Sequence, residues 1–217
     1  IIPFEEVTDR FTSMEEASPV LSDWRESVVS SSIRSLYENT QATPGLRWRL
    51  ASLNQALGSL RKGNFGFVFA RRETGKTTFL ASELTFMAEQ VPIDAGPIVW
   101  FNNEQAGADV QERISQATLG ATREQLYKDL DGNDAQYNAR IRGKLILIDN
   151  ASFNKRDIEG ILKELKPSLI VFDQIDNLKG FKADRPDLEF KEIYQWGREL
   201  AEVYGPVIGI CQAGGTG

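Results

Sequence analysis

A glycine, a lysine and two threonines lie where an apolar segment gives way to a helical pattern. The segment from Phe65 to Phe69 is apolar and β-prone, and apolar residues recur at helical spacing from Phe79 onward. Between them the chain reads Ala70-Arg71-Arg72-Glu73-Thr74-Gly75-Lys76-Thr77-Thr78. A strand, a turn ending in Gly-Lys-Thr and a helix form the context in which this pattern cradles phosphate groups. The alternative is a Lys-Thr pair that only begins a surface helix, and it leaves the preceding strand without a role.

The residue types of this loop suit the phosphates of a nucleotide. Backbone N–H groups of residues 70–78 are expected to face the phosphates, and the dipole of the following helix favours their charge. Gly75 allows the backbone to come close, Lys76 neutralises the β- and γ-phosphates, and the Thr77 hydroxyl can ligate Mg²⁺. Ala70 stands at the position of the pattern's first glycine. The turn must therefore form without a positive φ at Ala70, or with mild strain.

Three other apolar segments end in polar residues that could act on a nucleotide. Asp173 is placed to orient a water on Mg²⁺ beside Thr77, and its alternative role is to cap a turn or helix. Gln174 comes next in place of a glutamate, so the carboxylate that activates water must lie elsewhere. Glu104 is the best-placed candidate, although a surface glutamate that begins a helix would look the same. Gln212 could sense the γ-phosphate by a hydrogen bond, but an isolated strand-end glutamine carries little information.

Strands and helices alternate along the chain that would position these residues. Apolar strands are expected at residues 65–69, 98–101, 145–149, 169–172 and 206–211. Helices are expected at residues 48–60, 79–90, 110–119, 155–166 and 188–204, with two short helices flanking a turn at 131–133. This alternation predicts an α/β fold with a parallel sheet covered by helices on both faces. Ligands of such sheets bind outside the carboxyl ends of the strands, where the four polar sites fall.

The composition narrows the classes of protein. The chain has 217 residues, 41% of them apolar, which suffices for one α/β domain with a core. A net charge of −6 gives no overall basic field that would recruit nucleic acid. Histidine is absent, and the single Cys211 excludes an internal disulfide. With no apolar run of about 18 residues and no signal peptide, we expect a soluble protein of the cytoplasm that does not bind membranes.

The N-terminal region differs from the rest. Residues 1–22 are acidic with scattered apolar anchors, and Asp23 could cap a helix that runs to about Asn39. Residues 40–45 are expected to be a linker ending in Pro44-Gly45. The helix could pack on its own domain or dock on a neighbouring subunit, and the sequence leaves both possibilities open.

These segments, in this order, resemble the ring-shaped replicative helicases of the DnaB type, within the RecA-like ATPases. The resemblance covers roughly residues 45–217, with residues 1–44 as an arm and linker. Arg113, nine residues after Glu104, also falls where the family often has an arginine. The resemblance is carried by the loop at 70–79, Phe101-Asn102-Asn103-Glu104, Leu145 to Asn150, Leu169 to Asp173 and Val207 to Gln212.

The resemblance implies a RecA-like P-loop NTPase that uses ATP and Mg²⁺. Hydrolysis would occur at the subunit interfaces of a hexameric ring that moves on single-stranded DNA, with a primase or a helicase loader as a possible partner. Glu104 would be the catalytic base, Lys76 and Gln212 would act on the γ-phosphate, and Thr77 and Asp173 would hold the metal. For a phage-encoded member, which the compact domain and its arm resemble, the location would be the host cytoplasm.

Two departures from the family pattern bear on these expectations. Arg72 stands where the family usually has a proline in the loop. The family's second DNA-contacting loop, its final strands and the arginine finger given to the next subunit would lie beyond Gly217. We therefore expect the C-terminal part of the domain to be missing from this sequence.

A charged loop after Asp173 is the candidate contact to DNA. Lys179, Lys182 and Arg185 lie in it, and six copies around a channel would concentrate positive charge that one copy lacks. A solvated connector whose charges only maintain solubility is the alternative.

Two other functions fit part of the pattern. One is a RecA-like recombinase or mediator that forms filaments on single-stranded DNA, and the other is a non-catalytic module whose assembly depends on bound nucleotide. Phage DNA-packaging motors share a phosphate loop but usually place Asp-Glu at the second nucleotide motif, and Asp173-Gln174 argues against them.

Overall fold

A computed structural model describes residues 28, 31–141, 143–149, 152–181 and 186–213. The chain divides into two compact units, Ile1–Thr43 and Pro44–Gly217. In the first unit the described part is essentially helix α2 (Ile33–Ala42), and the second unit contains the sheet. No helix in the described part of the chain has the length and apolar character needed to span a membrane.

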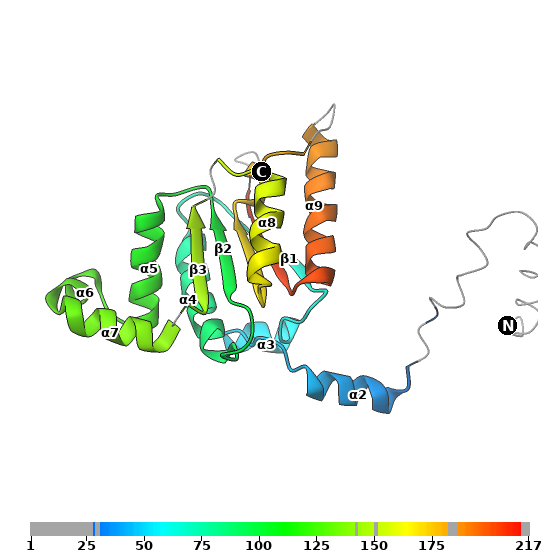
Figure 1. Cartoon of the computed structure of the whole chain (residues 1–217), viewed down its shortest axis with the longest axis horizontal. Helices are drawn as coiled ribbons and strands as arrows, with labels where there is room; N and C mark the ends of the chain where they lie inside the picture. The colour runs from blue at the N-terminus through cyan, green and yellow to red at the C-terminus, as the bar shows by residue number, and fades with distance from the viewer. Residues whose placement is uncertain (1–27, 29–30, 142, 150–151, 182–185, 214–217) are drawn as a thin grey trace, which may run out of the picture. The chain divides into compact units, whose positions relative to one another are not determined.

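Five parallel strands form one sheet in the second unit (Figure 1). Their order is β1-β5-β4-β2-β3, so the chain crosses over between neighbours that are distant in sequence. The carboxyl ends of all five strands lie on the same side of the sheet, because the strands are parallel. There Ala70 pairs with Gln212, and Asn102 pairs with both Asp149 and Asp173. The strands are β1 (Phe65–Ala70), β2 (Ile98–Asn102), β3 (Leu145–Asp149), β4 (Leu169–Asp173) and β5 (Val207–Gln212). The predicted parallel sheet is confirmed.

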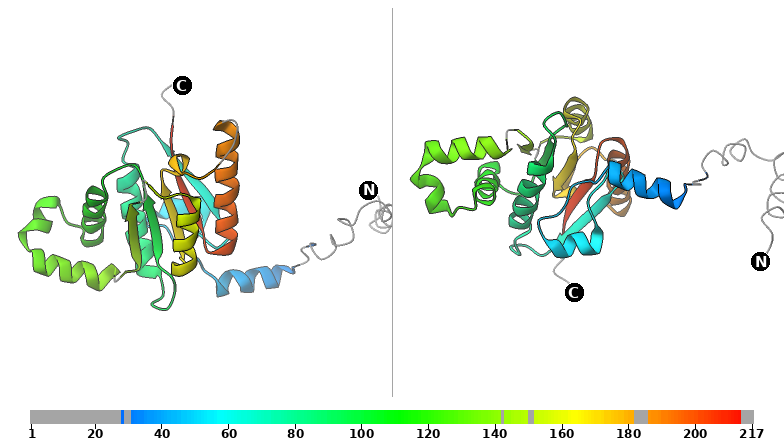
Figure 2. Two further views of the ribbon diagram at one scale, coloured as in Figure 1. Left: turned by 45° about the horizontal axis from the view of Figure 1, so that its top comes forward. Right: turned by 90° about the horizontal axis from the view of Figure 1, so that it is seen from below.

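Helices cover both faces of this sheet (Figure 2). One face packs on α4 (Lys76–Gln90), α5 (Gly107–Leu119) and the end of α7 (Leu130–Ile141), together with Trp48. The other packs on α8 (Lys155–Leu165), the short 3₁₀ helix η2 (Ile175–Asn177) and α9 (Pro186–Val203). Two short helices complete the unit, α3 (Ala51–Leu57) and α6 (Arg123–Lys128).

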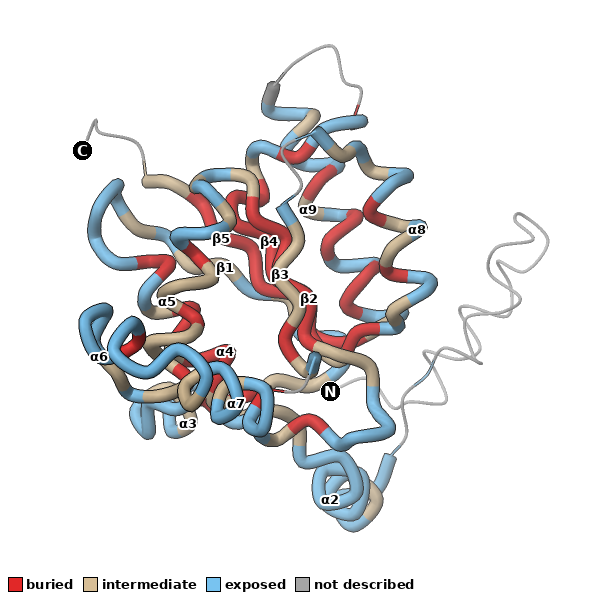
Figure 3. Tube along the Cα trace, turned by 60° about the vertical axis from the view of Figure 1, so that its left-hand side comes forward, coloured by how far each residue is buried: buried red, intermediate tan, exposed pale blue. Residues whose placement is uncertain are grey.

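The central strands are buried on both sides, as Figure 3 shows by colour. Along β2, Trp100 contributes to the cluster under α4 and α5, whereas its neighbours Val99 and Phe101 contribute to the cluster under α8 and α9. Because successive side chains of a strand point to opposite faces, a strand covered on both sides must be continuously apolar. The buried strands β2 and β4 thus place their last residues, Asn102 and Asp173, at fixed positions in the sheet.

The segment after α5 differs from its prediction. The expected turn at Asp131-Gly132-Asn133 lies inside helix α7, and the break falls at Asp129 instead. Asp129 accepts hydrogen bonds from the backbone N–H groups of Gly132, through its carboxylate at 3.0 Å, and of Asn133, through its carbonyl at 3.0 Å. An aspartate before a helix satisfies the unpaired N–H groups of the first turn, and this effect outweighs the turn propensity of Asp-Gly-Asn.

Helix α2 also has other bounds than predicted. Of the expected helix from Asp23 to Asn39, residues 23–27 lie outside the described residues, and Ser31 and Ser32 are not helical. Ser32 caps the helix, since its hydroxyl accepts a hydrogen bond from the Ser35 N–H at 3.1 Å. The helix continues through Thr40 to Ala42, into the predicted linker, and the Thr40 hydroxyl donates to the Leu36 carbonyl at 2.8 Å.

Candidate nucleotide site

The loop between β1 and α4 forms without a positive φ at Ala70. Ala70 is the last residue of β1, and the left-handed conformations fall at Glu73, with φ 59°, and Gly75, with φ 90°. The tight part of the turn therefore lies three residues later than the missing glycine. A non-glycine residue tolerates this region poorly, so Glu73 carries the conformational cost that Gly75 avoids.

The two residues after Gly75 begin helix α4 and are buried. Lys76 is 7% exposed and Thr77 is 5% exposed. The Lys76 ammonium donates to two carbonyl oxygens of its own loop, those of Ala70 at 3.4 Å and Arg71 at 3.2 Å. It is therefore held over the loop, next to the N–H groups of the first helical turn, where an anion is favoured.

A cavity of about 660 Å³ opens at the loop. It lies at the carboxyl-end edge of the sheet, as expected for a ligand of a parallel sheet. The structure brings Glu104 from the end of β2 into the same cavity as the phosphate loop. Its lining consists of Arg72, Glu73, Gly75, Lys76, Thr77, Thr78, Glu104, Gln105 and Arg113.

Asp173 at the end of β4 is a buried carboxylate with no hydrogen-bond partner among the described residues. Its side chain is 1% exposed, and neither Oδ1 nor Oδ2 accepts a hydrogen bond there. Burial raises the pKa of Asp173 to about 6, the negative charge of Glu104 adds to this rise, and Lys76 opposes it. When it is ionised, such a carboxylate is stabilised by a nearby cation.

The residues present fit a magnesium ion that is held jointly by protein and nucleotide. In the described part of the chain, no three acidic or cysteine side chains gather to bind a metal by themselves. Mg²⁺ is commonly bound by one or two protein oxygens, with phosphates and waters completing its shell. The unpartnered oxygens of Asp173 and the Thr77 hydroxyl are suitable oxygens of this kind.

The turn that carries Glu104 is fastened on both sides, while Glu104 itself is exposed. On one side, the Asn102 amide donates to the Gln105 carbonyl at 2.6 Å. On the other, the Asn103 side chain accepts from the Gln174 N–H at 2.6 Å and donates to the Gln174 carbonyl at 2.9 Å. These bonds fix the ends of β2 and β4 relative to each other and leave the Glu104 carboxylate facing the cavity.

Gln212, at the end of β5, belongs to a second polar group and does not line this cavity. Its side-chain oxygen accepts a hydrogen bond from the Gln174 amide at 3.3 Å. The Gln174 oxygen in turn accepts from Asn177 in η2 at 3.4 Å. Gln174 stands where the Asp-Glu motif has its glutamate. Through these two bonds it connects the ends of β4 and β5 to helix η2.

A family model described as an AAA domain matches residues 34–214. The chain belongs to this AAA domain family. No curated protein sequence matches it.

Two solved structures show the fold of this AAA domain. A DnaB-like replicative helicase, described with its interactions with primase, has a TM-score of 0.66 at 17% identity, over 95% of this chain and 55% of that one. A second structure, described as an ATPase domain, has a TM-score of 0.67 at 18% identity, over 86% of this chain and 73% of that one. The chain thus spans about half the length of the DnaB-like helicase. Its fold is that of DnaB-type, RecA-like ATPase domains.

Reasoning from sequence missed one contact of the AAA domain's site. Gln105 bridges α5 and the phosphate loop: its amide nitrogen donates to Thr77 Oγ1 at 3.1 Å, and its oxygen accepts from Arg113. Gln105 directly follows Glu104, so a polar side chain one position beyond the strand-end carboxylate was the available signal. The family resemblance points to Arg113, and the structure places Arg113 in the cavity.

The predicted DNA loop is described only in part. Lys182 and Arg185 lie outside the described residues. The Lys179 backbone pairs with the start of α8, where the Lys155 N–H donates to the Lys179 carbonyl at 3.0 Å. Lys179 therefore lies beyond the carboxyl ends of β3 and β4, but not in the cavity lined by the phosphate loop.

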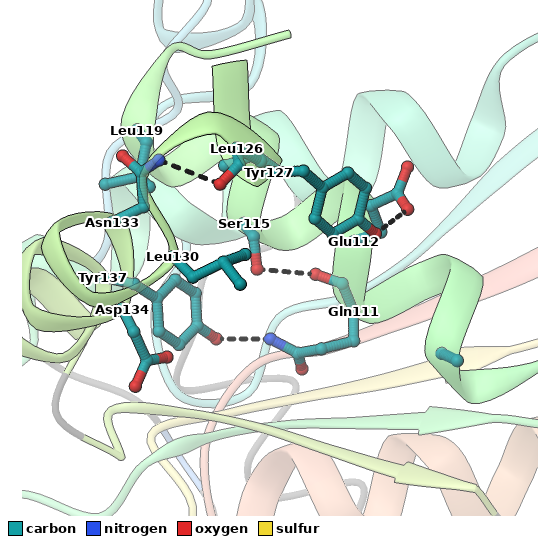
Figure 4. Close-up of a pocket in the computed structure, with 11 residues that line it drawn as sticks. Gln111, Glu112, Ser115, Leu119, Leu126, Tyr127, Leu130, Asn133, Asp134 and Tyr137 are labelled. Atoms are coloured by element: carbon teal, nitrogen blue, oxygen red, sulfur yellow. Dashed lines mark hydrogen bonds between the residues drawn. The ribbon is translucent and has the colours of Figure 1, made fainter. Parts of the chain in front are cut away.

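A second cavity, of about 380 Å³, lies between α5, α6 and α7 (Figure 4). Its polar groups contact each other: the Gln111 amide donates to the Tyr137 hydroxyl at 2.8 Å, and the Tyr127 hydroxyl donates to Glu112 at 2.6 Å. None of the candidate nucleotide-site residues lines it.

Proposed function

We propose that this RecA-like ATPase is an ATP-driven DNA helicase or translocase that works as a hexameric ring. The observation that carries the proposal is the set of groups at one edge of the sheet. The phosphate loop and the exposed Glu104 line one cavity, and the unpartnered Asp173 at the end of β4 lies near enough for the charges of Lys76 and Glu104 to shift its pKa. The fold shared with DnaB-type ATPase domains supports the choice of helicase among phosphate-loop enzymes.

Binding of ATP would exchange weak internal contacts for strong external ones. Lys76 would leave the carbonyl oxygens of Ala70 and Arg71, which lie 3.2–3.4 Å away, for the β- and γ-phosphate oxygens. Thr77 and Asp173 would hold Mg²⁺, which neutralises the charge that develops on the phosphates during transfer. A cation beside Asp173 would lower again the pKa that burial raises to about 6.

Glu104 would act as the general base that takes a proton from the attacking water. Asn102 and Asn103 fix its backbone, so the carboxylate stays at the cavity without sharing its oxygens with either asparagine. A base in an open cavity loses efficiency because bulk water competes for the reacting group. Closure of this face by a neighbouring subunit would exclude that water, which links hydrolysis to assembly.

Gln212 would report the state of the γ-phosphate. Its bond to Gln174, and that of Gln174 to Asn177, lead away from the cavity to η2 and then to the loop containing Lys179. Loss of the γ-phosphate would thereby alter the segment proposed to contact DNA.

Assembly is supported by apolar side chains on α2. Ile33 is 87% exposed and Tyr37 is 65% exposed. Apolar side chains that gather on one exposed helix suit docking on another subunit. In a ring, Lys179, Lys182 and Arg185 of each copy would contribute to a positively charged channel for single-stranded DNA, despite the net charge of −6. A primase or a loader would be a further partner.

Electron microscopy with a slowly hydrolysed ATP analogue and single-stranded DNA tests the proposal. Rings, together with DNA-stimulated ATP hydrolysis, are the expected result, and deletion of residues 1–39 is expected to leave monomers. Filaments would favour the recombinase alternative, and nucleotide-dependent assembly without hydrolysis would favour the non-catalytic module.

The DNA contact has its own control. Replacing Lys179, Lys182 and Arg185 together by alanine is expected to weaken DNA binding by the assembled form and to reduce its salt dependence. Nucleotide affinity should not change. Tight binding of DNA by the ATP-free monomer would contradict this part of the proposal.

A further inference from the structure

The Gln105 side chain is held from two directions at the edge of the nucleotide cavity. Arg113, two turns into α5, donates to its oxygen, and its amide nitrogen donates to Thr77 Oγ1 at 3.1 Å. The backbone of Gln105 is fixed as well, because the Asn102 amide donates to its carbonyl at 2.6 Å. This half-buried glutamine, with so many constraints, has lost the rotamer freedom that glutamine side chains keep on the surface.

Arginine determines which way the amide faces. A guanidinium has donors only, so the atom of Gln105 that meets Arg113 must be its oxygen. The NH₂ group therefore faces Thr77, and the Thr77 hydroxyl must accept this hydrogen bond. Were Arg113 absent, the amide could turn over, and Thr77 could donate to the Gln105 oxygen instead.

The direction of this bond matters for a metal ligand. A hydroxyl oxygen has two lone pairs and one proton. Gln105 takes one lone pair of Thr77, which leaves one lone pair for a cation and the proton for another acceptor. The Thr77 side chain is buried and held in one orientation before any ion arrives. Groups that orient a metal ligand in this way typically change metal affinity 10–100-fold when removed.

We propose that Gln105, fixed by Arg113, is a positioning residue that prepares the Thr77 hydroxyl to ligate Mg²⁺. This inference rests on the proposed nucleotide site and adds a control over its metal. It also assigns Arg113 a role through Gln105, without contact between Arg113 and the ion.

The test measures how much Mg²⁺ strengthens nucleotide binding. ADP affinity of the full chain is measured in EDTA and across a Mg²⁺ titration. For Gln105→Leu we expect a Mg²⁺ midpoint raised about 10-fold, measured relative to the affinity of the same variant in EDTA. Arg113→Leu should raise the midpoint similarly, Arg113→Lys should restore most of the effect, and the double leucine variant should be no worse than Gln105→Leu alone.

Gln111→Leu is the matched control. Gln111 lies on the same helix α5 and also makes a side-chain hydrogen bond, but to Tyr137 in the second cavity. Its replacement should leave the Mg²⁺ midpoint unchanged. Melting curves of all variants check that the fold persists.

The outcomes separate this inference from the proposed function. If the unaltered protein binds no ADP, or binds it equally after Lys76→Ala, the nucleotide site itself is wrong. If the unaltered protein binds and Gln105→Leu keeps its Mg²⁺ midpoint, only the positioning role is wrong. A lower midpoint in Gln105→Leu would show that Gln105 obstructs the metal, which also overturns the proposal.

Discussion

The two cavities described here differ in how their polar groups are partnered. Between α5, α6 and α7, Gln111 bonds Tyr137, and Glu112 bonds Tyr127 and pairs with Arg123 at 3.3 Å. Near the cavity at the phosphate loop, by contrast, both oxygens of Asp173, which is buried at the end of β4, lack a partner among the described residues. The one other such atom in the described part, the indole nitrogen of Trp100, carries no charge.

This difference separates a site arranged for a ligand from a surface arranged for packing. An unpaired buried carboxylate costs free energy in the folded state, and a protein retains one where a ligand supplies the missing charge. Satisfied hydrogen bonds at a cavity need no ligand to explain them. The contrast predicts that matched substitutions in the two cavities have different consequences.

The largest expected effect is on the rate of hydrolysis. Glu104→Gln should bind Mg-ATP normally and hydrolyse it about 10²–10⁴-fold more slowly, because an amide cannot take the proton from water. Glu112→Gln makes the same chemical change in the second cavity and should leave turnover unchanged. Steady-state hydrolysis and equilibrium binding of both variants check this. Normal turnover in Glu104→Gln would place the base elsewhere.

Lys76→Ala should have the next largest effect, on affinity. Loss of a charged hydrogen bond to the phosphates costs about 1.5–3 kcal/mol, or roughly 10–150-fold in the dissociation constant for ATP. Lys128→Ala removes a lysine from α6 and serves as the control. Titration calorimetry gives both values, and an affinity for ATP within twofold of the parent after Lys76→Ala would refute the site.

Asp173→Asn should stabilise the fold while weakening Mg²⁺ binding. The folded-state pKa of Asp173 is raised to about 6, so the folded protein binds this proton more tightly than the unfolded chain does. Its contribution to the free energy of unfolding therefore falls as pH rises from about 4 to about 6, by up to about 3 kcal/mol. Replacement by asparagine removes this titration.

Urea unfolding at pH 5 and pH 7 measures the effect. The advantage of Asp173→Asn over the parent should be about 1 kcal/mol greater at pH 7 than at pH 5. Asp134→Asn, at an exposed aspartate of the second cavity, is the matched control for the same chemical change. A variant less stable than the parent at pH 7 would mean that Asp173 is stabilised in the folded protein by a group other than a bound cation.

The fold could be predicted from the sequence because its signals are strong and local. Continuous apolar strands such as Leu169 to Phe172 need cover on both faces, and the structure has it. The sequence does not predict the break at Asp129, because whether a cap at Asp129 outweighs the turn signal of residues 131–133 depends on contacts that the sequence pattern does not show. The start of α2 was missed because serines favour capping over the helix interior.

The candidate site was predictable as a set of strand ends but not as a set of contacts. Parallel pairing brings Ala70, Asn102, Asp173 and Gln212 to one edge whatever their side chains are. The bond from Gln105 to Thr77 depends on the path of the turn after β2, which Asn102 and Asn103 set. The periodicity of apolar residues in the sequence carries no information about such side-chain geometry. The chemical roles of the site residues stay predictions.

The smallest expected effect tests whether the second cavity is structural. Tyr137→Phe removes the hydroxyl that accepts from Gln111 at 2.8 Å and should lower the free energy of unfolding by about 1 kcal/mol. Because the phosphate loop makes no contact with this pair among the described hydrogen bonds, ATP affinity and turnover should not change. Urea unfolding and a binding titration on one preparation give both answers. A threefold change in ATP affinity would mean that α5 transmits changes at Gln111 to Arg113 and Gln105, and the second cavity would then be coupled to the first.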